Sequence, residues 1–333
     1  NYIKGIGAVP MGIGNKNLKW ERTLSANLGL DLTMFKGRWD FSADVYVKNT
    51  DNLLLDITKA PSLGITTSRE NVGEVENHGF EFQTRVIPIK NKDWEWSLSL
   101  NYAYNKNKIK KISNALREQN EKNQAKGGVT PLPIYEEGQS LTALKVVSSA
   151  GIDPITGNEV FIKRDGSLTF VYDPNDKVVY GDTTPFGMGS LGSYLTYKQF
   201  SMGMSMRYSF GGAVYNQTLA SKVEGADPRY NADERVFSSR WKEVGQQAKY
   251  KRISDSSVPM QTSRFVETNN YITLSSLSLA YEVPLTFIKR YGLKRLHLEM
   301  LANDLFYLSS VKRERGLSYP YERSVEFSVR LGF

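Results

Sequence analysis

The segment Val325-Glu326-Phe327-Ser328-Val329-Arg330-Leu331-Gly332-Phe333 closes the chain. Its odd positions are Val, Phe, Val, Leu and Phe, and its even positions are Glu, Ser, Arg and Gly. Successive side chains of a β-strand point to opposite faces, so this strand has one apolar and one polar face. A transmembrane barrel strand needs a lipid face, a wet face and an aromatic at the interface. Soluble proteins more often end in a polar, frayed tail, so the segment favours a membrane barrel.

Eight further segments alternate in the same way, which predicts an all-β chain of nine strands. The nine predicted strands cover residues 22–34, 39–47, 77–89, 94–104, 188–197, 200–210, 271–283, 295–307 and 322–333. Trp94 and Tyr104 lie ten residues apart on one face. Ten residues at ~3.3 Å each and ~45° tilt rise about 23 Å, close to the ~25 Å apolar band of such barrels. We expect the apolar faces to contact lipid, among them Leu24, Trp39, Phe41, Val45, Trp94, Leu98, Met204 and Val329.

The connections between the predicted strands follow a pattern of length. Long connections fall at about 51–75, 109–186 and 213–265, and the intervening ones are short or, at 284–294, of medium length. If the last strand ends in the periplasm, every long connection lies on the opposite side, with a modest loop at 309–321. Membrane barrels have short periplasmic turns and long external loops. We therefore predict an antiparallel transmembrane β-barrel with extracellular loops at the three long connections.

The composition of the 333 residues limits the classes of function. There is no cysteine, so disulfides and thiolate chemistry are excluded. No apolar run of 18 residues exists, which argues against a transmembrane helix but not against alternating barrel strands. We interpret the net charge of +8 as solubility and loop solvation. A nucleic-acid partner would need a basic stripe with interleaved aromatics, and the basic stretches 106–111 and 249–252 lie instead between strand-like segments.

No motif for catalysis, metal binding or cofactor binding stands out. The two histidines, His78 and His297, have no partner at metal-ligand spacing. Nucleophile, phosphate-binding and dinucleotide motifs are missing from the sequence. Five aspartates in the second long loop do not match a calcium-loop pattern and are typical of turns. They are Asp153, Asp165, Asp173, Asp176 and Asp182. We expect a protein that is not an enzyme.

Charged residues opposite the apolar stripe are candidates for lining a wet lumen or meeting a plug. These candidates are Asp31, Asp44, Glu95, Arg207, Glu326 and Arg330. In a soluble barrel the same residues would only be surface. Tyr135, Tyr172 and Tyr180 lie in the second long loop and are candidates for stacking on a substrate, although plain loop packing explains them equally well.

Six stretches carry a family resemblance. Residues 15–21 read NKNLKWE, which is similar to N-P-N-L-K-W-E with Lys16 in place of Pro. Residues 44–54 and 71–81 resemble D-Y-Y-x-K-x-T-x-D-L-L and N-x-G-x-x-x-N-x-G-x-E. The remaining three, at 181–185, 264–284 and 303–306, resemble G-D-P-x-P, F-V-E-x-x-x-Y-L-R-L and N-L-F. With these motifs the chain resembles the SusC/RagA-type TonB-dependent transporters of the Bacteroidetes outer membrane.

The resemblance implies a 22-stranded barrel with a plugged lumen, of which this chain would be about the last nine strands. It implies import of a glycan or peptide, a SusD-like surface lipoprotein as lid, and a TonB complex that acts through the N-terminal part. The chain begins without Met or a signal peptide, so we expect a fragment that lacks signal peptide, plug and coupling segment. The last strand is similar to the assembly signal of outer-membrane proteins, with Phe327, Val329, Leu331 and Phe333.

Two alternatives remain open from the sequence. One is a passive, porin-like outer-membrane barrel, because an upstream plug and coupling motif would be needed to exclude it. The other is a soluble β-sandwich that binds or degrades glycans, because a single alternating strand also suits a soluble core.

Overall fold

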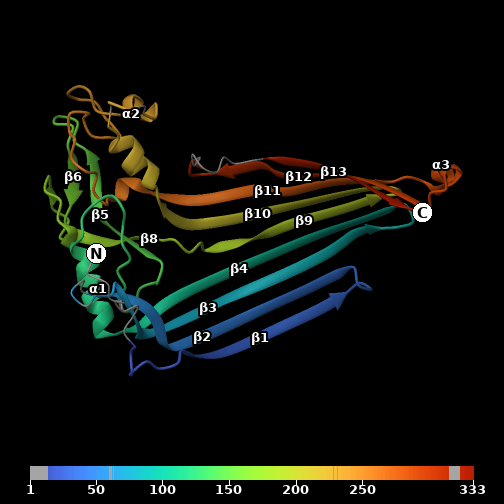
Figure 1. The fold of residues 1–333 in the computed structure, drawn as a ribbon, viewed down its shortest axis with the longest axis horizontal. Coiled ribbons are helices and arrows are strands. Elements are labelled where there is room, and N and C mark those ends of the chain that lie inside the picture. The colour runs from blue at the N-terminus through green and yellow to red at the C-terminus, as the bar shows by residue number, and fades with distance from the viewer. Residues whose placement is uncertain (1–13, 60–61, 63, 228, 231, 315–322) are drawn as a thin grey trace, which may run out of the picture.

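The computed structural model describes residues 14–333 except 60–61, 63, 228, 231 and 315–322. Most of the glycine-rich stretch at 5–14, and residues 315–321 of the final predicted loop, lie outside this part. Nine strands form one antiparallel sheet in the order β1-β2-β3-β4-β9-β10-β11-β12-β13 (Figure 1). Their bounds are β1 Arg22–Met34, β2 Trp39–Thr58, β3 Thr67–Lys90, β4 Trp94–Ile112, β9 Gly187–Tyr197, β10 Phe200–Tyr215, β11 Val266–Glu282, β12 Arg295–Ser309 and β13 Ser324–Gly332.

All nine predicted strands are confirmed, and so is the antiparallel all-β fold class. The strands lie side by side in one layer and do not form two packed sheets, which argues against the β-sandwich alternative (Figure 1). The short turns and Phe333 lie at one end of the sheet, which we call the turn end. The two large insertions lie at the other end, which we call the loop end.

The predicted loop at 51–75 is mostly strand. β2 runs on to Thr58 and β3 begins at Thr67, so the connection spans only 59–66. The register shifts beside Asn52, which has a φ of 55°, and Gly73, which has a φ of 154°. Such bulges exchange the two faces of a strand and hide it from a search for alternation. β4 likewise continues to Ile112, so the basic stretch 106–111 is strand and not a connection.

The register places the apolar side chains of all nine strands on one face. One cross-strand row, which crosses the middle part of β1 to β4, joins Leu28, Val45, Phe80 and Tyr104. Another row near the turn end consists of Trp94, Tyr197, Phe200, Tyr281, Leu298 and Val329. Aromatic rings concentrate in the row near the turn end, where the ring centres of Trp94 and Tyr197 lie 4.1 Å apart. The face is solvent-exposed, since Leu28 and Phe327 are 77% and 78% exposed.

The insertions at the loop end are ordered, which the sequence did not show. Between β4 and β9 lie α1 Asn114–Ala125 and a second sheet of order β7-β6-β5-β8. Its strands are β5 Ala143–Ile152, β6 Glu159–Ile162, β7 Leu168–Thr169 and β8 Lys177–Asp182. Between β10 and β11 lie η3 Leu219–Glu224, α2 Arg235–Ser238 and η4 Ser263–Phe265. No helix in the described ranges is long and apolar enough to cross a membrane.

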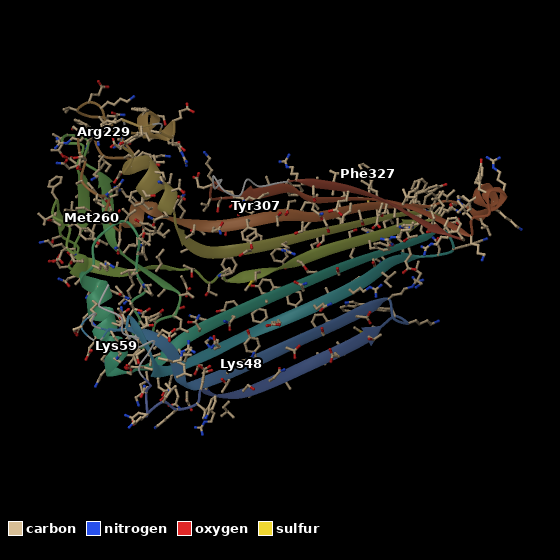
Figure 2. All side chains as sticks on the ribbon, in the orientation of Figure 1. Lys48, Lys59, Arg229, Met260, Tyr307 and Phe327 are labelled. Carbon is tan, nitrogen blue, oxygen red and sulfur yellow. The ribbon has the colours of Figure 1, made fainter. Side chains whose placement is uncertain are left out.

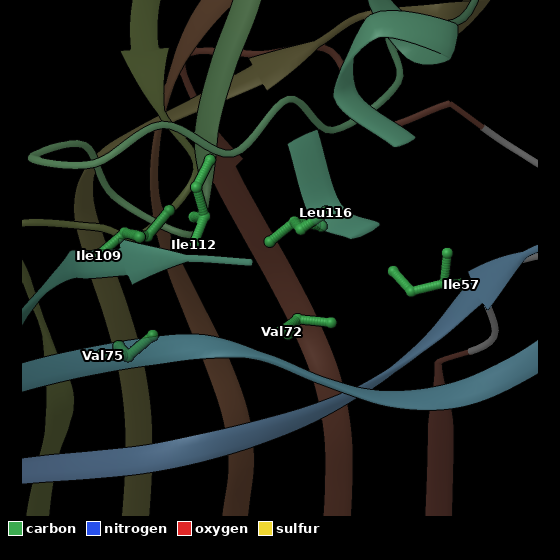
Figure 3. Packing of buried hydrophobic residues seen from close by; sticks show 6 residues of the cluster. All are labelled: Ile57, Val72, Val75, Ile109, Ile112 and Leu116. Atoms are coloured by element: carbon green, nitrogen blue, oxygen red, sulfur yellow. The ribbon is translucent and has the colours of Figure 1, made fainter. Parts of the chain in front are cut away.

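Two small cores hold these insertions on the ends of the long strands. In the first, Leu116 of α1 packs on β2, β3 and β4 through Ile57, Val72 and Ile112 (Figure 3). In the second, Phe265 and Tyr250 pack with residues of η3 and α2. The wall of the long sheet therefore continues beyond its exposed apolar band into a packed region at the loop end.

Candidate functional site

The two insertions join into one body, which we call the loop assembly and define as residues 113–186 and 216–265. Val147 of β5 forms an isolated bridge with Thr262, and its N–H donates to the carbonyl of Gln261 at 3.0 Å. Farther out, the indole N–H of Trp241 donates to the carbonyl of Pro154 at 2.9 Å. Figure 2 shows Lys59, Arg229 and Met260 at this end, with Lys48, Tyr307 and Phe327 along the long strands.

A buried ion triad lies at the centre of the loop assembly. Arg264 donates from Nε and Nη2 to the Glu159 carboxylate at 2.7 and 2.6 Å, and from Nη1 and Nη2 to Glu224 at 2.7 and 2.8 Å. Its remaining N–H binds the carbonyl of Lys249 at 2.9 Å, so all five donors are used. Burial alone would lower the pKa of Arg264, but the hydrogen bonds to both carboxylates raise it. The triad thus fixes three distant segments with a single side chain.

Two further buried cations bind backbone carbonyls. The ammonium of Lys177 donates to the carbonyls of residues 123, 124 and 126 at 3.4, 3.1 and 3.2 Å, where α1 ends. A cation there satisfies carbonyls that the helix leaves free and complements its dipole. Burial lowers the pKa of Lys177. Arg240 donates to four carbonyls, those of Val236, Val223, Glu224 and Lys251. These cations belong to the packing of the loop assembly and not to a solvated loop surface.

Three of the family-like motifs, at 15–21, 44–54 and 71–81, meet at the loop end of β1. The amide of Asn71 donates to the carbonyls of Lys19 and Asn52 at 2.9 and 2.8 Å, and its oxygen accepts from the N–H of Lys19 at 2.8 Å. Glu21 accepts from the N–H of Leu54 at 3.3 Å. The side chains of Asn71 and Glu21 thereby hold the stretch 15–21 across the bulge of β2.

The six candidate lumen residues lie on the polar face, spread over five strands. Asp31 lies opposite Ser42, Arg207 opposite Thr273 and Glu326 opposite Leu301. The others make contacts of their own: Asp44 accepts from Asn27 at 3.3 Å, Glu95 pairs with Lys90 at 3.4 Å, and Arg330 pairs with Glu299 at 2.9 Å. The structure does not bring the six together, so they mark a wall and not a compact site.

A ladder of charged side chains also lies on this polar face. Of its members, only Arg330 was predicted from the sequence. Glu282 binds Arg295 at 2.8 Å and Nδ1 of His297 at 2.9 Å, while Nε2 of His297 lies 3.9 Å from Glu299. Glu299 completes the ladder through Arg330. The alternation of Arg295, His297 and Glu299 was the available signal, but their partners on β11 and β13 depend on the register.

The three candidate tyrosines differ in accessibility. Tyr135 packs against the first core, and burial raises its pKa. Tyr172 stacks edge-on against Phe161, and burial raises its pKa to about 12. Tyr180 is exposed. A role in substrate contact remains a prediction for all three, and the structure favours Tyr180 because its ring is accessible.

The loop aspartates act in local turns. Asp153 accepts from Thr156, Asp165 from Ser167, and Asp173 from the N–H of Asn175. Asp182 likewise accepts from the N–H of Thr184, whereas Asp176 accepts from the N–H of Arg164, 12 positions away. Among the described residues, no group of three or more His, Asp or Glu side chains is placed to hold a metal ion.

The candidate assembly signal lies exposed on β13 and just beyond it. Phe327, Val329, Leu331 and Phe333 all belong to the apolar set and are all exposed. Their exposure repeats the pattern of the other eight strands. The apolar face is thus continuous up to the end of the chain, opposite a polar face.

Known protein families and sequences include relatives of this chain. A family model described as TonB dependent receptor-like, beta-barrel, matches residues 5–299. TonB-dependent receptor P3 of Formosa agariphila is 30% identical over 318 residues, which cover 90% of this chain and 31% of that protein. TonB-dependent receptor SusC of Bacteroides thetaiotaomicron is 31% identical over 218 residues, which cover 63% of this chain and 21% of that protein.

Among solved structures, one of the RagAB peptide transporter matches with a TM-score of 0.79 at 22% identity, over 93% of this chain and 34% of that chain. At this identity the likeness concerns the fold. The chain spans about a third of the length of TonB-dependent receptor P3 and of the matched RagAB chain.

Proposed function

The chain belongs to the TonB dependent receptor-like β-barrel family, and we propose that it forms about the last nine strands of an outer-membrane nutrient importer. The resemblance of its motifs to SusC/RagA-type proteins is confirmed at the level of family and fold. The remaining strands, the plug and the segment coupled to TonB are expected in the rest of the protein.

The exposed apolar face is the observation that carries this proposal. Nine neighbouring strands share it, with a row of aromatic rings near the turn end and a polar face behind it. Monomeric soluble proteins rarely expose large contiguous apolar patches. Lipid outside and a wet lumen inside explain both faces. Asp31, Asp44, Glu95, Arg207, Glu326 and Arg330 then line the lumen or contact the plug.

We place the loop assembly outside the cell and the turn end in the periplasm. Long external loops and short periplasmic turns are the rule for such barrels. The loop assembly also exposes several large apolar side chains, which suits contact with another protein. They include Phe170, Val171, Tyr230, Phe237, Val244 and Val258. We assign to this surface the contact with a SusD-like lipoprotein, and Tyr180 to contact with a glycan or peptide. The fold of this chain is similar to that of the RagAB peptide transporter, which supports a peptide as the substrate.

Epitope tags test the topology in the full-length protein. Gly127 and Gly166 have open space around them and suit insertion, whereas a side chain at Gly225 would press on Pro259 beside the buried Glu224. Antibody should reach tags at 127 and 166 on intact cells. Labelling only after the outer membrane is permeabilised would invert the topology and reject the importer as proposed.

Lipoprotein co-purification and uptake test the mechanism. The full-length protein should co-purify with a surface lipoprotein, and uptake of its substrate should stop when TonB is deleted. If the tags are external but no lipoprotein co-purifies, the importer proposal stands and the lipoprotein lid is rejected. Uptake that continues without TonB would favour the passive barrel.

A further inference from the structure

The positive charge of the chain is concentrated at the turn end. Four connections lie at this end, at 35–38, 91–93, 198–199 and 283–294. They contain seven basic residues and one acidic residue, Asp93, a net charge of +6 against +8 for the whole chain. The basic residues are Lys36, Arg38, Lys92, Lys198, Lys289, Arg290 and Lys294. The rest of the chain is therefore almost neutral, and solubility does not explain where the charge lies.

These cations are not neutralised within the described part of the chain. None of the seven forms an ion pair with a described carboxylate, although several acidic residues lie nearby. Glu95 instead pairs with Lys90, and Glu282 with Arg295, so both carboxylates are already paired by cations of the strands. Arg38 donates to the carbonyl of Lys90 at 3.3 Å, which leaves its charge uncompensated. A cluster of this kind is available to an anionic partner.

Aromatic rings accompany the cations. Nζ of Lys198 lies 5.3 Å from the ring centre of Tyr197, and the guanidinium of Arg290 lies 4.8 Å from that of Tyr291. Phe35 stacks on Trp39 at 6.1 Å beside Lys36. Phe35 and Tyr291 are 70% and 66% exposed. Aromatic rings with adjacent cations are typical of side chains at the level of lipid headgroups.

We propose that the turn end binds the phosphates of anionic phospholipids in the leaflet that it contacts. The apolar face ends in the row of Trp94, Tyr197, Phe200 and Tyr281, and the basic turns begin directly beyond this row. A lipid whose tails lie against this face brings its headgroup to the cations. An anionic headgroup gains charge neutralisation that a zwitterionic one does not. The inference rests on the proposed membrane barrel and adds a preference for headgroup charge.

Lipid retention by the full-length protein tests the inference. The purified protein is equilibrated in detergent with equimolar phosphatidylglycerol and phosphatidylcholine, and bound lipids are counted by native mass spectrometry. The wild type should retain phosphatidylglycerol preferentially. Combined Lys36→Gln, Lys92→Gln and Lys198→Gln should lower the ratio of the two lipids at least fivefold, because one basic residue near an anionic surface contributes about a fivefold preference. Lys289→Gln with Arg290→Gln and Lys294→Gln provides an independent second variant.

The matched control removes the same charge from the loop end, through Lys163→Gln, Lys222→Gln and Lys242→Gln, which are also exposed. An unchanged ratio in both turn-end variants, or an equal loss in the control, would overturn the proposal. So would displacement of the lipid by inorganic phosphate but not by chloride at equal ionic strength, which would identify a soluble phosphate site. Insertion into neutral phosphatidylcholine vesicles reports on the barrel separately. Insertion without lipid preference rejects only this inference, whereas failure to insert rejects the barrel as well.

Discussion

The guanidinium of Arg264 binds the carboxylate of Glu159 through two hydrogen bonds of 2.7 and 2.6 Å, although 105 positions separate the two residues. Glu159 belongs to the first large insertion and Arg264 to the end of the second, so one side chain fastens the two. The bidentate geometry orients both partners as well as attracting them. The loop assembly is therefore expected to move as a unit and to present a preformed surface.

Arg264→Met should loosen the loop assembly. Removing one partner of a buried ion pair leaves an uncompensated charge and costs about 3–5 kcal/mol. In this variant Glu159 and Glu224 would both lose their cationic partner. Hydrogen exchange in β6 and η3 should rise sharply while exchange in the long strands stays unchanged. Arg229→Met is the control, because its ion pair with Asp227 is exposed. Equal exchange in the two variants would show that the triad does not fasten the insertions.

Asp255 should make part of the loop assembly sensitive to acid. Burial raises the pKa of this carboxyl, but hydrogen bonds from Ser257 and Lys251 outweigh burial and hold the pKa at about 2. The folded pKa lies below the unfolded value of about 3.9, so the stabilisation is complete above pH 4 and is lost as the pH falls toward 2. Its size is on the order of 2 kcal/mol.

Amide exchange of residues 251–259, corrected for intrinsic rates, should therefore accelerate between pH 4 and pH 2. Asp255→Asn should lose the ion pair with Lys251 at neutral pH and should flatten this dependence. If the variant keeps the acid transition of the wild type, another group is responsible.

Met204→Arg should impair insertion, whereas Ser205→Arg should not. The two residues are neighbours on β10 and point to opposite faces, with Met204 opposite Leu277 and Ser205 opposite Ser276. Arginine at mid-membrane on a lipid face costs about 2–4 kcal/mol, but a wet lumen accepts it. Folding of the full-length protein into bilayers under a urea titration measures the difference. Equal stability of the two variants would contradict the assignment of a lipid face to Met204 and a lumen face to Ser205.

Deleting Phe333 should reduce assembly more than transport. The residue directly follows β13, the strand expected to close the barrel, and an open barrel edge in lipid leaves unpaired backbone groups. The amount of inserted protein should fall. It is measured in detergent gels from the band of folded protein, whose mobility differs between unheated and heated samples. Phe333→Tyr, which keeps an aromatic end, should assemble normally. Full insertion of the deleted form would argue against a role in assembly.

The sequence by itself determined the membrane-type wall. Alternation of period two is a local property, so β1 begins and ends where the pattern from Thr23 to Met34 places it, within one residue. The same pattern identified the face that carries Trp94, Met204 and Val329. It failed at Asn52 and Gly73, because a bulge exchanges the two faces and ends the alternation while the strand pair continues.

Only the tertiary structure decided the loop assembly and the charge of the turn end. Arg264, Lys177 and Arg240 look like ordinary solvated charges in the sequence, and their buried partners lie many residues away. The basic turns are likewise dispersed over most of the chain until the antiparallel order of the strands gathers them at one end. Local patterns report which way a side chain points, whereas the partner of a charge depends on which distant segments the fold brings together.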